Sequence, residues 1–487
     1  MTSKNFPYDR TSKKSIYDYA KKLEGHTFDE VLNDLNVGMV SDASSGTAGN
    51  RGRLGQLVEE AYFGYRANSN SAPDIEEAGV EIKTTPYEER NGKIRAGERL
   101  VLCNIGYNEP IETDLFSSHL WAKCQLLLLI YYLRNREIPP LSYIINYVYY
   151  FTPPEEDLRI IEEDYHAIVQ KVQEGRANEL SESDTRYLGA CTKGSTALKS
   201  FVRQYYNPSV LAKKRAFCYK QSYMTYVLNS YITKGVVLYE PIIKDKTELE
   251  HNDFDTIIRD KIQHFVGMTD REIAEHFGLE YTANKAQWTT LTYRMLGIKS
   301  NKAEEFVKAN IVTKVIRLEE NGKMKENMIT LDFKYKEIVE EENWENSALY
   351  NYFESTRFFF VVFKRVKGEY RLMGCQFWNM PQKDLNGYVK TCWENTVDVI
   401  EDGLRLTVTR TKTGVIVNNN LPGQKDNLIA HVRPHSSQTY YELADEQIYG
   451  KGKRSNANQL PDGRWVTNHC FWLNRDYVVS ILEKNLK

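Results

Sequence analysis

The sequence predicts an α/β protein of two tandem domains, each a mixed β-sheet flanked by helices. Three observations predict this fold class. The chain has 487 residues, which is more than one ordinary hydrophobic core organises, so two domains are the natural expectation. Short motifs recur in the same order at an offset near 230 residues. In each half a helical pattern precedes the strand patterns and mixed elements follow, which is typical of α/β or α+β cores.

The clearest repeated motif is a strand that occurs once in each half. Residues 78–83 read Ala-Gly-Val-Glu-Ile-Lys, and residues 309–314 read Ala-Asn-Ile-Val-Thr-Lys. An Asn-Gly-Lys turn follows in both copies, and the offset changes from 231 to 230 between strand and turn. This alignment puts Val312 where the first copy has Glu81. We therefore expect a working first copy and a second copy that has lost its acidic residue.

The other elements keep the same order in both halves. Each half opens with a helix for which a threonine, Thr27 or Thr269, is the expected N-cap. The further matching segments, first copy before second, are 63–66 with 296–299, 126–130 with 358–362, 154–158 with 381–385, Gly175 with Gly403, and 217–228 with 471–482. We expect domains at 1–235 and 256–487 with a linker at 236–255.

Composition limits the protein class. With 41% apolar and 27% charged residues the chain is globular, and it has no run of about 18 apolar residues that would span a membrane. Its seven cysteines form no C-x-x-C pair, and no apolar run follows the first basic residues. These features predict a cytoplasmic protein without a signal peptide. The net charge of −2 neither predicts nor excludes a nucleic-acid partner.

One motif of the first copy carries acid, metal and phosphate chemistry. Pro73-Asp74 is followed, after six residues, by Glu81-Ile82-Lys83. Side chains alternate along a strand, so Glu81 and Lys83 lie on one face, where Asp74 can meet them. Two carboxylates suit Mg²⁺, and a lysine can orient or deprotonate a water molecule, which together would hydrolyse a phosphodiester. An E-x-K triplet is common by chance, and a surface strand with an ion pair is the simpler alternative.

The segments around the motif favour a catalytic site over a surface strand with an ion pair. The sequence resembles the MutH-type and GATC-specific type II restriction endonucleases, a branch of the PD-(D/E)xK nucleases. The residues that carry the resemblance are the string 73–86, a helix at 55–64 and a segment at 118–123. The resemblance covers essentially the whole chain, in the two-copy arrangement of the larger restriction enzymes. It implies two tandem restriction-endonuclease-like, MutH-like domains.

The resemblance also implies a role for each site residue. Asp74 and Glu81 would bind the metal ion, and Lys83 would position the attacking water. Glu59 would assist metal binding, and Lys123 would support the phosphate or the water.

The acidic residue of the helix remains ambiguous. Glu59 stands four residues after Gly55, as the family pattern asks. Counting back from Asp74 favours Glu60 instead.

The second copy lacks most of this set. The positions that align with Asp74, Glu81, Glu59 and Lys123 are Glu305, Val312, Thr292 and Ser355, and Lys314 alone matches Lys83 in kind. A valine in place of the central carboxylate cannot hold Mg²⁺ in the same way. We expect this copy to be inactive and to serve in binding.

Two polar loops are the expected places of base contact. Lys193 and Ser195 belong to the first, and Arg433 and His435 to the second. Arginine and lysine donate to guanine, while small hydroxyl residues allow a close approach. Lys220 is a further candidate for a phosphate contact. An ordinary polar loop is the alternative for both segments.

The complete prediction is a type II restriction endonuclease that cuts both strands of double-stranded DNA at GATC, 5′ of the G, with Mg²⁺. The second copy would bind a second GATC site as an effector. We expect a monomer that dimerises transiently on DNA. No Walker A loop or GxGxxG element occurs, so no nucleotide cofactor is expected. The alternatives are a repair-type nickase and a non-catalytic DNA-binding protein, and methylation sensitivity stays open.

Overall fold

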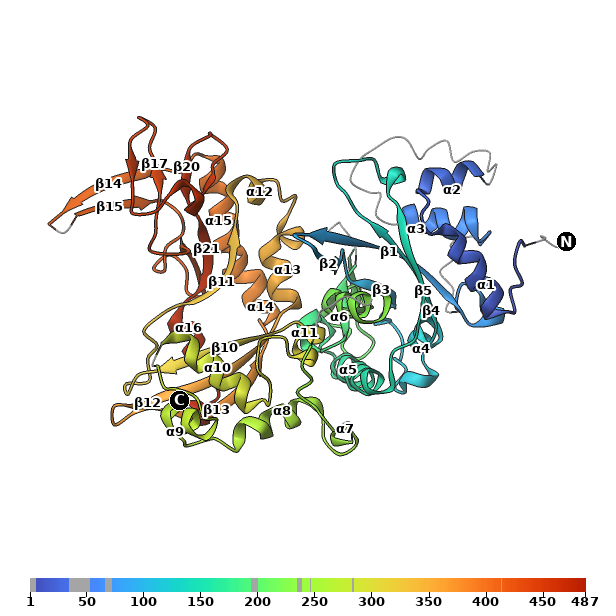
Figure 1. Cartoon of the computed structure of the whole chain (residues 1–487), viewed down its shortest axis with the longest axis horizontal. Coiled ribbons are helices and arrows are strands. Elements are labelled where there is room, and N and C mark those ends of the chain that lie inside the picture. The colour runs from blue at the N-terminus through green and yellow to red at the C-terminus, as the bar shows by residue number, and fades with distance from the viewer. Residues whose placement is uncertain are drawn as a thin grey trace. The chain divides into compact units, whose positions relative to one another are not determined.

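The computed structural model describes residues 6–34, 53–65, 72–193, 200–233, 239–245, 247–282, 284–412 and 414–487 (Figure 1). The chain divides into two compact units, described separately below. Unit 1 is Met1–Asp253 with Lys302–Asn310, and unit 2 is Phe254–Asn301 with Ile311–Lys487. In the described part of the chain, every helix is too short or too polar to cross a lipid bilayer.

Unit 1 is built on a mixed sheet with the strand order β2-β1-β4-β5. The strands are β1 (Glu81–Arg90), β2 (Lys93–Ala96), β4 (Leu127–Leu133) and β5 (Ile145–Phe151). β1 runs parallel to β4, and the other pairs are antiparallel. β4 is apolar and buried at almost every position, as expected for a strand covered on both faces. Because β1 pairs with β4 on one side and with β2 on the other, it lies in the interior of the sheet.

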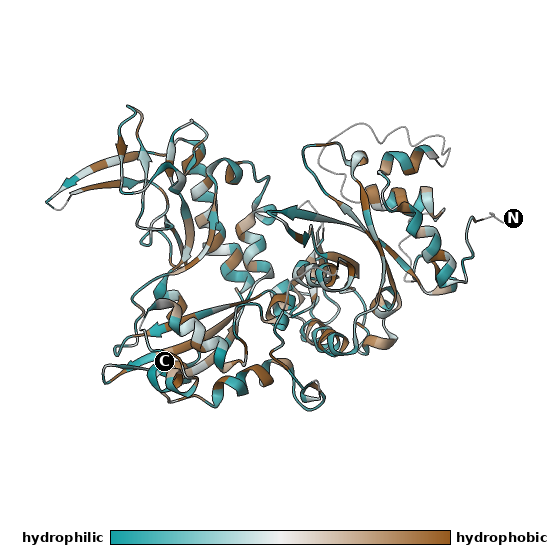
Figure 2. Cartoon of the chain, viewed as in Figure 1, coloured by the Kyte–Doolittle hydropathy of each residue, from teal (hydrophilic) through white to brown (hydrophobic). Residues whose placement is uncertain are grey.

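Three short helices cover one face of this sheet. They are α1 (Lys13–Ala20), α2 (Phe28–Asp34) and α3 (Arg53–Leu57), and a π-helical turn, Val58–Tyr62, continues α3. Their apolar sides join one core with Ile82 of β1. Figure 2 shows apolar and polar residues alternating along these helices, as amphipathic helices require.

A second, antiparallel sheet completes the core of unit 1. Its order is β3 (Leu100–Asn104), β9 (Arg215–Tyr219), β6 (Leu188–Thr192). The remaining elements of unit 1 are α4 (His119–Cys124), α5 (Glu155–Gln173), α6 (Gln221–Val227), α7 (Glu248–His251), α11 (Glu304–Ala309), and the small strands β7 (Phe201–Arg203) and β8 (Leu211–Lys213).

Within its described residues, unit 2 repeats the antiparallel sheet and three of the four strands of the mixed sheet, without a counterpart of β2. One sheet is β10-β12-β13 and the other β11-β21-β16, with β10 parallel to β12 and all other pairs antiparallel. The strands are β10 (Ile311–Leu318), β11 (Met328–Phe333), β12 (Arg357–Val366), β13 (Glu369–Trp378), β16 (Ala430–Pro434) and β21 (His469–Leu473). The mixed α/β fold predicted from the sequence is confirmed.

Helices pack around these sheets. They are α8 (Phe254–Gln263), α9 (Asp270–His276), α10 (Lys285–Met295), α12 (Tyr335–Val339), α13 (Ala348–Ser355), α14 (Gln382–Asp384), α15 (Lys390–Glu401) and α16 (Arg475–Ser480). Of these, α12, α13, α15 and α16 contribute residues to one large hydrophobic core.

Local details agree between the two units. The expected caps at Thr27 and Thr269 are confirmed, because each forms a capping box with the glutamate three residues later. Gly79 and Asn310 both adopt the left-handed conformation, with φ of 65° and 52°, just before β1 and β10. Asparagine tolerates this region better than most residues other than glycine.

Unit 2 also has strands beyond its two main sheets. An antiparallel ribbon is formed by β14 (Leu406–Thr411) and β15 (Gly414–Asn419). A small sheet has the order β18-β17-β20-β19, with strands β17 (Tyr441–Glu442), β18 (Ile448–Tyr449), β19 (Ala457–Gln459) and β20 (Trp465–Thr467).

Candidate active site

A tight turn before β1 brings two carboxylates together. Ile75 and Val80 exchange backbone hydrogen bonds of 2.9 and 3.1 Å and so close the turn. A 3₁₀ segment, Glu76–Ala78, fills it, and Gly79 supplies the left-handed residue that ends it. This closure is the physical reason for the spacing between Asp74 and the strand.

The two acids are held by backbone amides. The amide of Ile82 donates to Asp74 Oδ2 at 2.9 Å, and the amide of Asp74 donates to Glu81 Oε2 at 3.2 Å. Glu81 is only 2% exposed, whereas Asp74 is partly buried. Because the backbone fixes both carboxylates, the pair is preorganised at the start of β1.

Two lysines neutralise Glu81. Lys83, on the same face of β1 as strand alternation predicts, donates to Glu81 Oε1 at 2.7 Å. Lys123, on α4, lies 3.3 Å from both oxygens of Glu81. The four residues predicted from two separate segments, 73–86 and 118–123, therefore meet at one point.

The pKa values follow from burial and charge. Burial, and then the charge of Glu81, raises the pKa of Asp74. Burial alone would lower the pKa of Lys83, but the contact with Glu81 outweighs it and raises this pKa. Lys83 therefore stays a cation at neutral pH.

Glu59 lies close enough to feel this cluster. It is on the π-helical turn after α3, and burial followed by repulsion from Asp74 raises its pKa to about 7. Glu60 is exposed and accepts a hydrogen bond from Gln56 at 3.0 Å. Of the two glutamates that the sequence left open, Glu59 is the one electrostatically coupled to the site.

The two carboxylates suit a hard cation that takes only a few of its ligands from the protein. Among the described residues no group of three or more His, Cys, Asp and Glu side chains is arranged to hold a metal ion. Asp74 and Glu81 supply two carboxylates, and Mg²⁺ is commonly held by one or two carboxylates together with water and substrate phosphates. Lys83 and Lys123 would have to give up some of their contacts with the Glu81 carboxylate when a cation binds.

Unit 2 carries different chemistry at the same strand position. Val312 packs against the hydrophobic core of this unit. Lys314 donates to the carbonyl of Ile329 at 2.9 Å, and burial lowers its pKa. Thr292 is fully buried and donates to the carbonyl of Trp288. These side chains form no acidic cluster.

The strand register changes one predicted match, so that residues 127–131, and not 126–130, correspond to 358–362. Glu81 pairs with Leu127, and Val312 pairs with Phe358, so the offset of 231 holds for both strands of the parallel pair. Continued back into the preceding helix, this offset puts Glu354 at the position of Lys123. Glu354 is buried and accepts a hydrogen bond from Gln382.

Of the predicted DNA-contacting residues, three are exposed, one lies outside the described residues and one is buried. Lys193 is exposed and donates to Asn104 Oδ1 at 2.7 Å, while Ser195 lies outside the described residues. Arg433 is exposed, with its guanidinium 4.8 Å from the centre of the Trp472 ring, and His435 is also exposed.

Lys220 is placed differently. It is 1% exposed, and its ammonium group donates to the carbonyl of Thr185 inside unit 1. We therefore give Lys220 a structural role and leave it out of the DNA contacts proposed below.

Sequence reasoning missed two residues near the site. Asn104 holds Lys193, and Cys103 is close enough to Lys123 and Lys83 for their charges to act on its thiol. Both come from β3, which reaches the site only through tertiary folding. Neither stands in a motif that could have marked it.

Comparison with known proteins agrees with this geometry. A family model described as the DNA mismatch repair enzyme MutH matches residues 63–164, which include Asp74, Glu81, Lys83 and Lys123. The type II restriction enzyme Sau3AI of Staphylococcus aureus is 33% identical, over 97% of this chain and 98% of its own length. The chain belongs to the Sau3AI family of type II restriction enzymes. It is thus a restriction endonuclease, an enzyme that hydrolyses DNA, and restriction endonucleases typically depend on a metal ion.

MutH proteins match a smaller part of this Sau3AI-family chain. The DNA mismatch repair protein MutH of Actinobacillus pleuropneumoniae is 26% identical over 40% of the chain and 83% of its own length. That of Serratia proteamaculans is 22% identical over 44% of the chain and 90% of its own length. A single-copy nickase would leave half of this chain without a counterpart, which weighs against that alternative.

Proposed function

We propose that this enzyme recognises GATC in double-stranded DNA and cuts both strands 5′ of the G, with Mg²⁺ as cofactor. The observation that carries the catalytic part is the convergence of Asp74, Glu81, Lys83 and Lys123 at the start of β1. The GATC sequence and the cut position are supported by the resemblance of the chain to GATC-specific enzymes.

The residues divide the work of the reaction. Asp74 and Glu81 would hold Mg²⁺, which when bound supplies positive charge to the phosphoryl oxygens and acidifies water. Lys83 would orient the attacking water, and Lys123 would stabilise negative charge on the scissile phosphate. Glu59 would add a carboxylate whose pKa falls as a cation approaches.

A plasmid assay tests the reaction. Purified enzyme is incubated with unmethylated plasmid with and without Mg²⁺, and the fragment ends are sequenced. We expect cleavage only with Mg²⁺, and ends whose 5′ overhang spells GATC. Fragments that end at another sequence would contradict the assignment of specificity. A one-site plasmid that accumulates only nicked circles would favour the repair-type nickase.

We further propose that unit 2 is an inactive MutH-like domain that binds a second GATC site as an effector. Its sheets share the order β1-β4-β5 and β3-β9-β6 of unit 1, Val312 stands at the position of Glu81, and Arg433 is exposed for base contact. Allostery requires that the effector favour one state of the enzyme. The test is whether a short GATC duplex accelerates cleavage of a one-site plasmid, whereas a duplex of scrambled sequence does not.

One active site per chain implies a transient dimer on DNA. We propose a monomer in solution, in which residues 1–235 form the catalytic domain and residues 256–487 the effector domain, joined at 236–255. Two chains would then meet to cut both strands. The rate of double-strand cleavage should rise more steeply than linearly with enzyme concentration, and a strictly linear dependence would contradict dimerisation.

A further inference from the structure

The two units differ in how the long helix connects to the edge strand of the antiparallel sheet. In unit 1, residues 174–187 join α5 to β6. In unit 2, residues 402–429 join α15 to β16, and they contain the ribbon β14–β15. Figure 1 shows this ribbon projecting from its unit as a long arm. The ribbon is thus an insertion that belongs to unit 2 alone.

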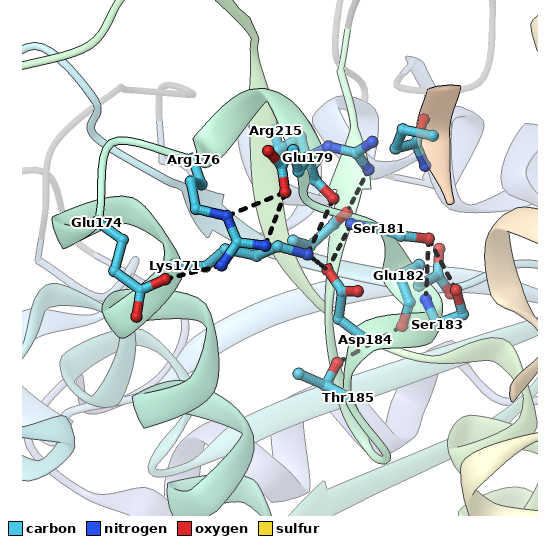
Figure 3. A network of polar contacts seen from close by, with 12 residues as sticks. Lys171, Glu174, Arg176, Glu179, Ser181, Glu182, Ser183, Asp184, Thr185 and Arg215 are labelled. Atoms are coloured by element: carbon cyan, nitrogen blue, oxygen red, sulfur yellow. Dashed lines mark hydrogen bonds and ion pairs between the residues drawn. The ribbon is translucent and has the colours of Figure 1, made fainter. Parts of the chain in front are cut away.

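The shorter connection of unit 1 satisfies its own charges. Lys171 pairs with Asp184 at 2.8 Å, and Arg176 pairs with Glu179 at 2.7 Å (Figure 3). Ser181 and Asp184 form a capping box in the same network. Lys171 and Arg176 therefore each have an acidic partner, and these ion pairs stabilise the connection.

The ribbon of unit 2 has cations without acids. Residues 404–420 include Arg405, Arg410 and Lys412 and contain no Asp or Glu. Within the described residues none of these three side chains forms an ion pair. A segment with three positive charges and no acidic partner is complementary to a polyanion.

The ribbon is also exposed on both faces over its outer half. Thr407, Thr409 and Asn418 are exposed on one face, and Val415 and Ile416 are 48% and 51% exposed near the tip. An isolated two-stranded ribbon is marginally stable in water, and it leaves both strand edges unpaired. Its solvent exposure therefore points to a partner that covers it.

The base of the ribbon is fixed to the predicted recognition face. Leu406 and Val417 pack on the core of unit 2, and Asn419 lies 3.3 Å from Nε2 of His469 on β21. The residues of β21 beside this contact pair with β16, where Cys470 is opposite Arg433. The base of the ribbon and the strand of the proposed base-reading arginine thus both contact β21.

We propose that the ribbon β14–β15 is a DNA arm that grips the phosphate backbone of the duplex bound by unit 2. Arg405, Arg410 and Lys412 would contact phosphates, and the slender threonine-rich ribbon fits along a groove of duplex DNA. This inference rests on the proposed effector role of unit 2. It adds a contact surface that unit 1 does not possess.

Salt dependence of binding tests the arm. The full chain carrying Glu81→Gln, which should cut about 10³-fold more slowly than the unchanged enzyme, is compared with the same chain that also carries Arg410→Ala and Lys412→Ala. Binding to GATC and scrambled duplexes is measured from 50 to 200 mM salt. We expect the slope of log K against log salt to fall by about 2, since each lost phosphate contact removes about 0.9. Affinity should fall for both duplexes, with their ratio preserved.

The matched control removes the same charge elsewhere. Lys383 and Lys484 are exposed in unit 2, away from the ribbon, and their double replacement by alanine should leave the slope unchanged. A ribbon variant with the slope of this control overturns the arm. Arg433→Ala separates the two proposals, because it should reduce the GATC ratio. An unchanged ratio would count against the proposed recognition by unit 2 and not against the arm.

Cross-linking locates the partner directly. Lys412→Cys is labelled with a photoactivatable group, with Lys383→Cys as the control; Cys103 is the one partly exposed native cysteine and all others are buried. We expect the probe at 412, but not at 383, to cross-link to labelled duplex. Cross-links to a second protein chain, with none to DNA, would show a self-association edge and overturn the proposal.

Discussion

The strands β1 and β10 each pair in parallel with the corresponding strand, β4 or β12, in the same register, but carry different chemistry. Each runs parallel to the strand after it, with Glu81 opposite Leu127 and Val312 opposite Phe358. In β1 the acid and Lys83 form an ion pair of 2.7 Å. In β10 the valine joins the hydrophobic core. The parallel pairing is therefore the same in both strands although the side chains differ, because backbone pairing does not depend on those side chains.

The lysine shows what the loss of one carboxylate does to its neighbour. Lys83 and Lys314 are both buried, which disfavours the ammonium form. Next to Glu81 the pKa of Lys83 is raised, whereas Lys314, with only a carbonyl as partner, has a lowered pKa. The first lysine therefore stays a cation at neutral pH, whereas burial disfavours the ammonium form of the second.

The acidic residue that precedes each strand also has different contacts in the two copies. Asp74 lies beside Glu81, but Glu305 accepts hydrogen bonds of 2.9 Å from the amides of Ile242 and Ile243. α11, which contains Glu305, belongs to unit 1 and is held there by the buried pair of Lys308 and Asp157 at 2.7 Å. The carboxylate of the second copy has become structural.

The largest effect is expected from the central acid. Glu81→Gln should reduce the cleavage rate by about 10³-fold, because it removes charge from the centre of the site. Val312→Ala, at the equivalent position, should leave cleavage within about twofold and cost about 1 kcal/mol of stability. Single-turnover cleavage and urea unfolding measure the two quantities. A Glu81→Gln enzyme with the wild-type rate would contradict the assignment.

Asp74 and Glu305 should separate activity from stability. Asp74→Asn should lower cleavage by about 10²-fold without loss of stability, since the carboxylate is buried beside another acid. Glu305→Gln should cost about 1–3 kcal/mol, because its amide cannot accept both backbone hydrogen bonds. Cleavage rates and denaturant midpoints distinguish these outcomes. Equal loss of stability in both variants would contradict the assignment of Asp74 to activity and of Glu305 to stability.

The two lysines give a smaller but opposite pair of effects. Lys83→Met should lower cleavage by about 10²-fold. Lys314→Met should raise the free energy of unfolding at pH 7 by about 1 kcal/mol, because it removes a buried charge. The folded-state pKa of Lys314 lies below its unfolded value, so stability rises with pH towards that value, and the variant should lose this rise. A destabilised Lys314→Met protein would contradict this account of the lysine.

The smallest expected effect is a pH dependence. The pKa of Glu59 is raised to about 7, so its carboxylate is lost as the pH falls through this value. Cleavage at limiting Mg²⁺ should decline by about tenfold from pH 8 to pH 6, and Glu59→Gln should remove that decline. Glu60→Gln is the control and should keep the wild-type profile. The same flattening in both variants would remove Glu59 from the site.

Local rules predicted the part of the site that lies within one strand. Alternation put Glu81 and Lys83 on one face, and the resemblance brought in Lys123 and Glu59. The register between strands depends on contacts far apart in sequence. The sequence therefore aligned Lys123 with Ser355, whereas the strand offset of 231 points to Glu354. The burial of Lys220 and the packing of α11 in unit 1 also depend on tertiary contacts. The ribbon occurs in one copy, so comparison of the copies could not predict it.

Manganese located in the crystal tests the central claim most directly. Crystals of the full chain with a GATC duplex are soaked in Mn²⁺, and its anomalous signal is mapped. We expect a peak beside Asp74 and Glu81 and none beside Val312 and Lys314. A peak at the second position, or none at the first, would contradict the assignment of one working and one inactive copy.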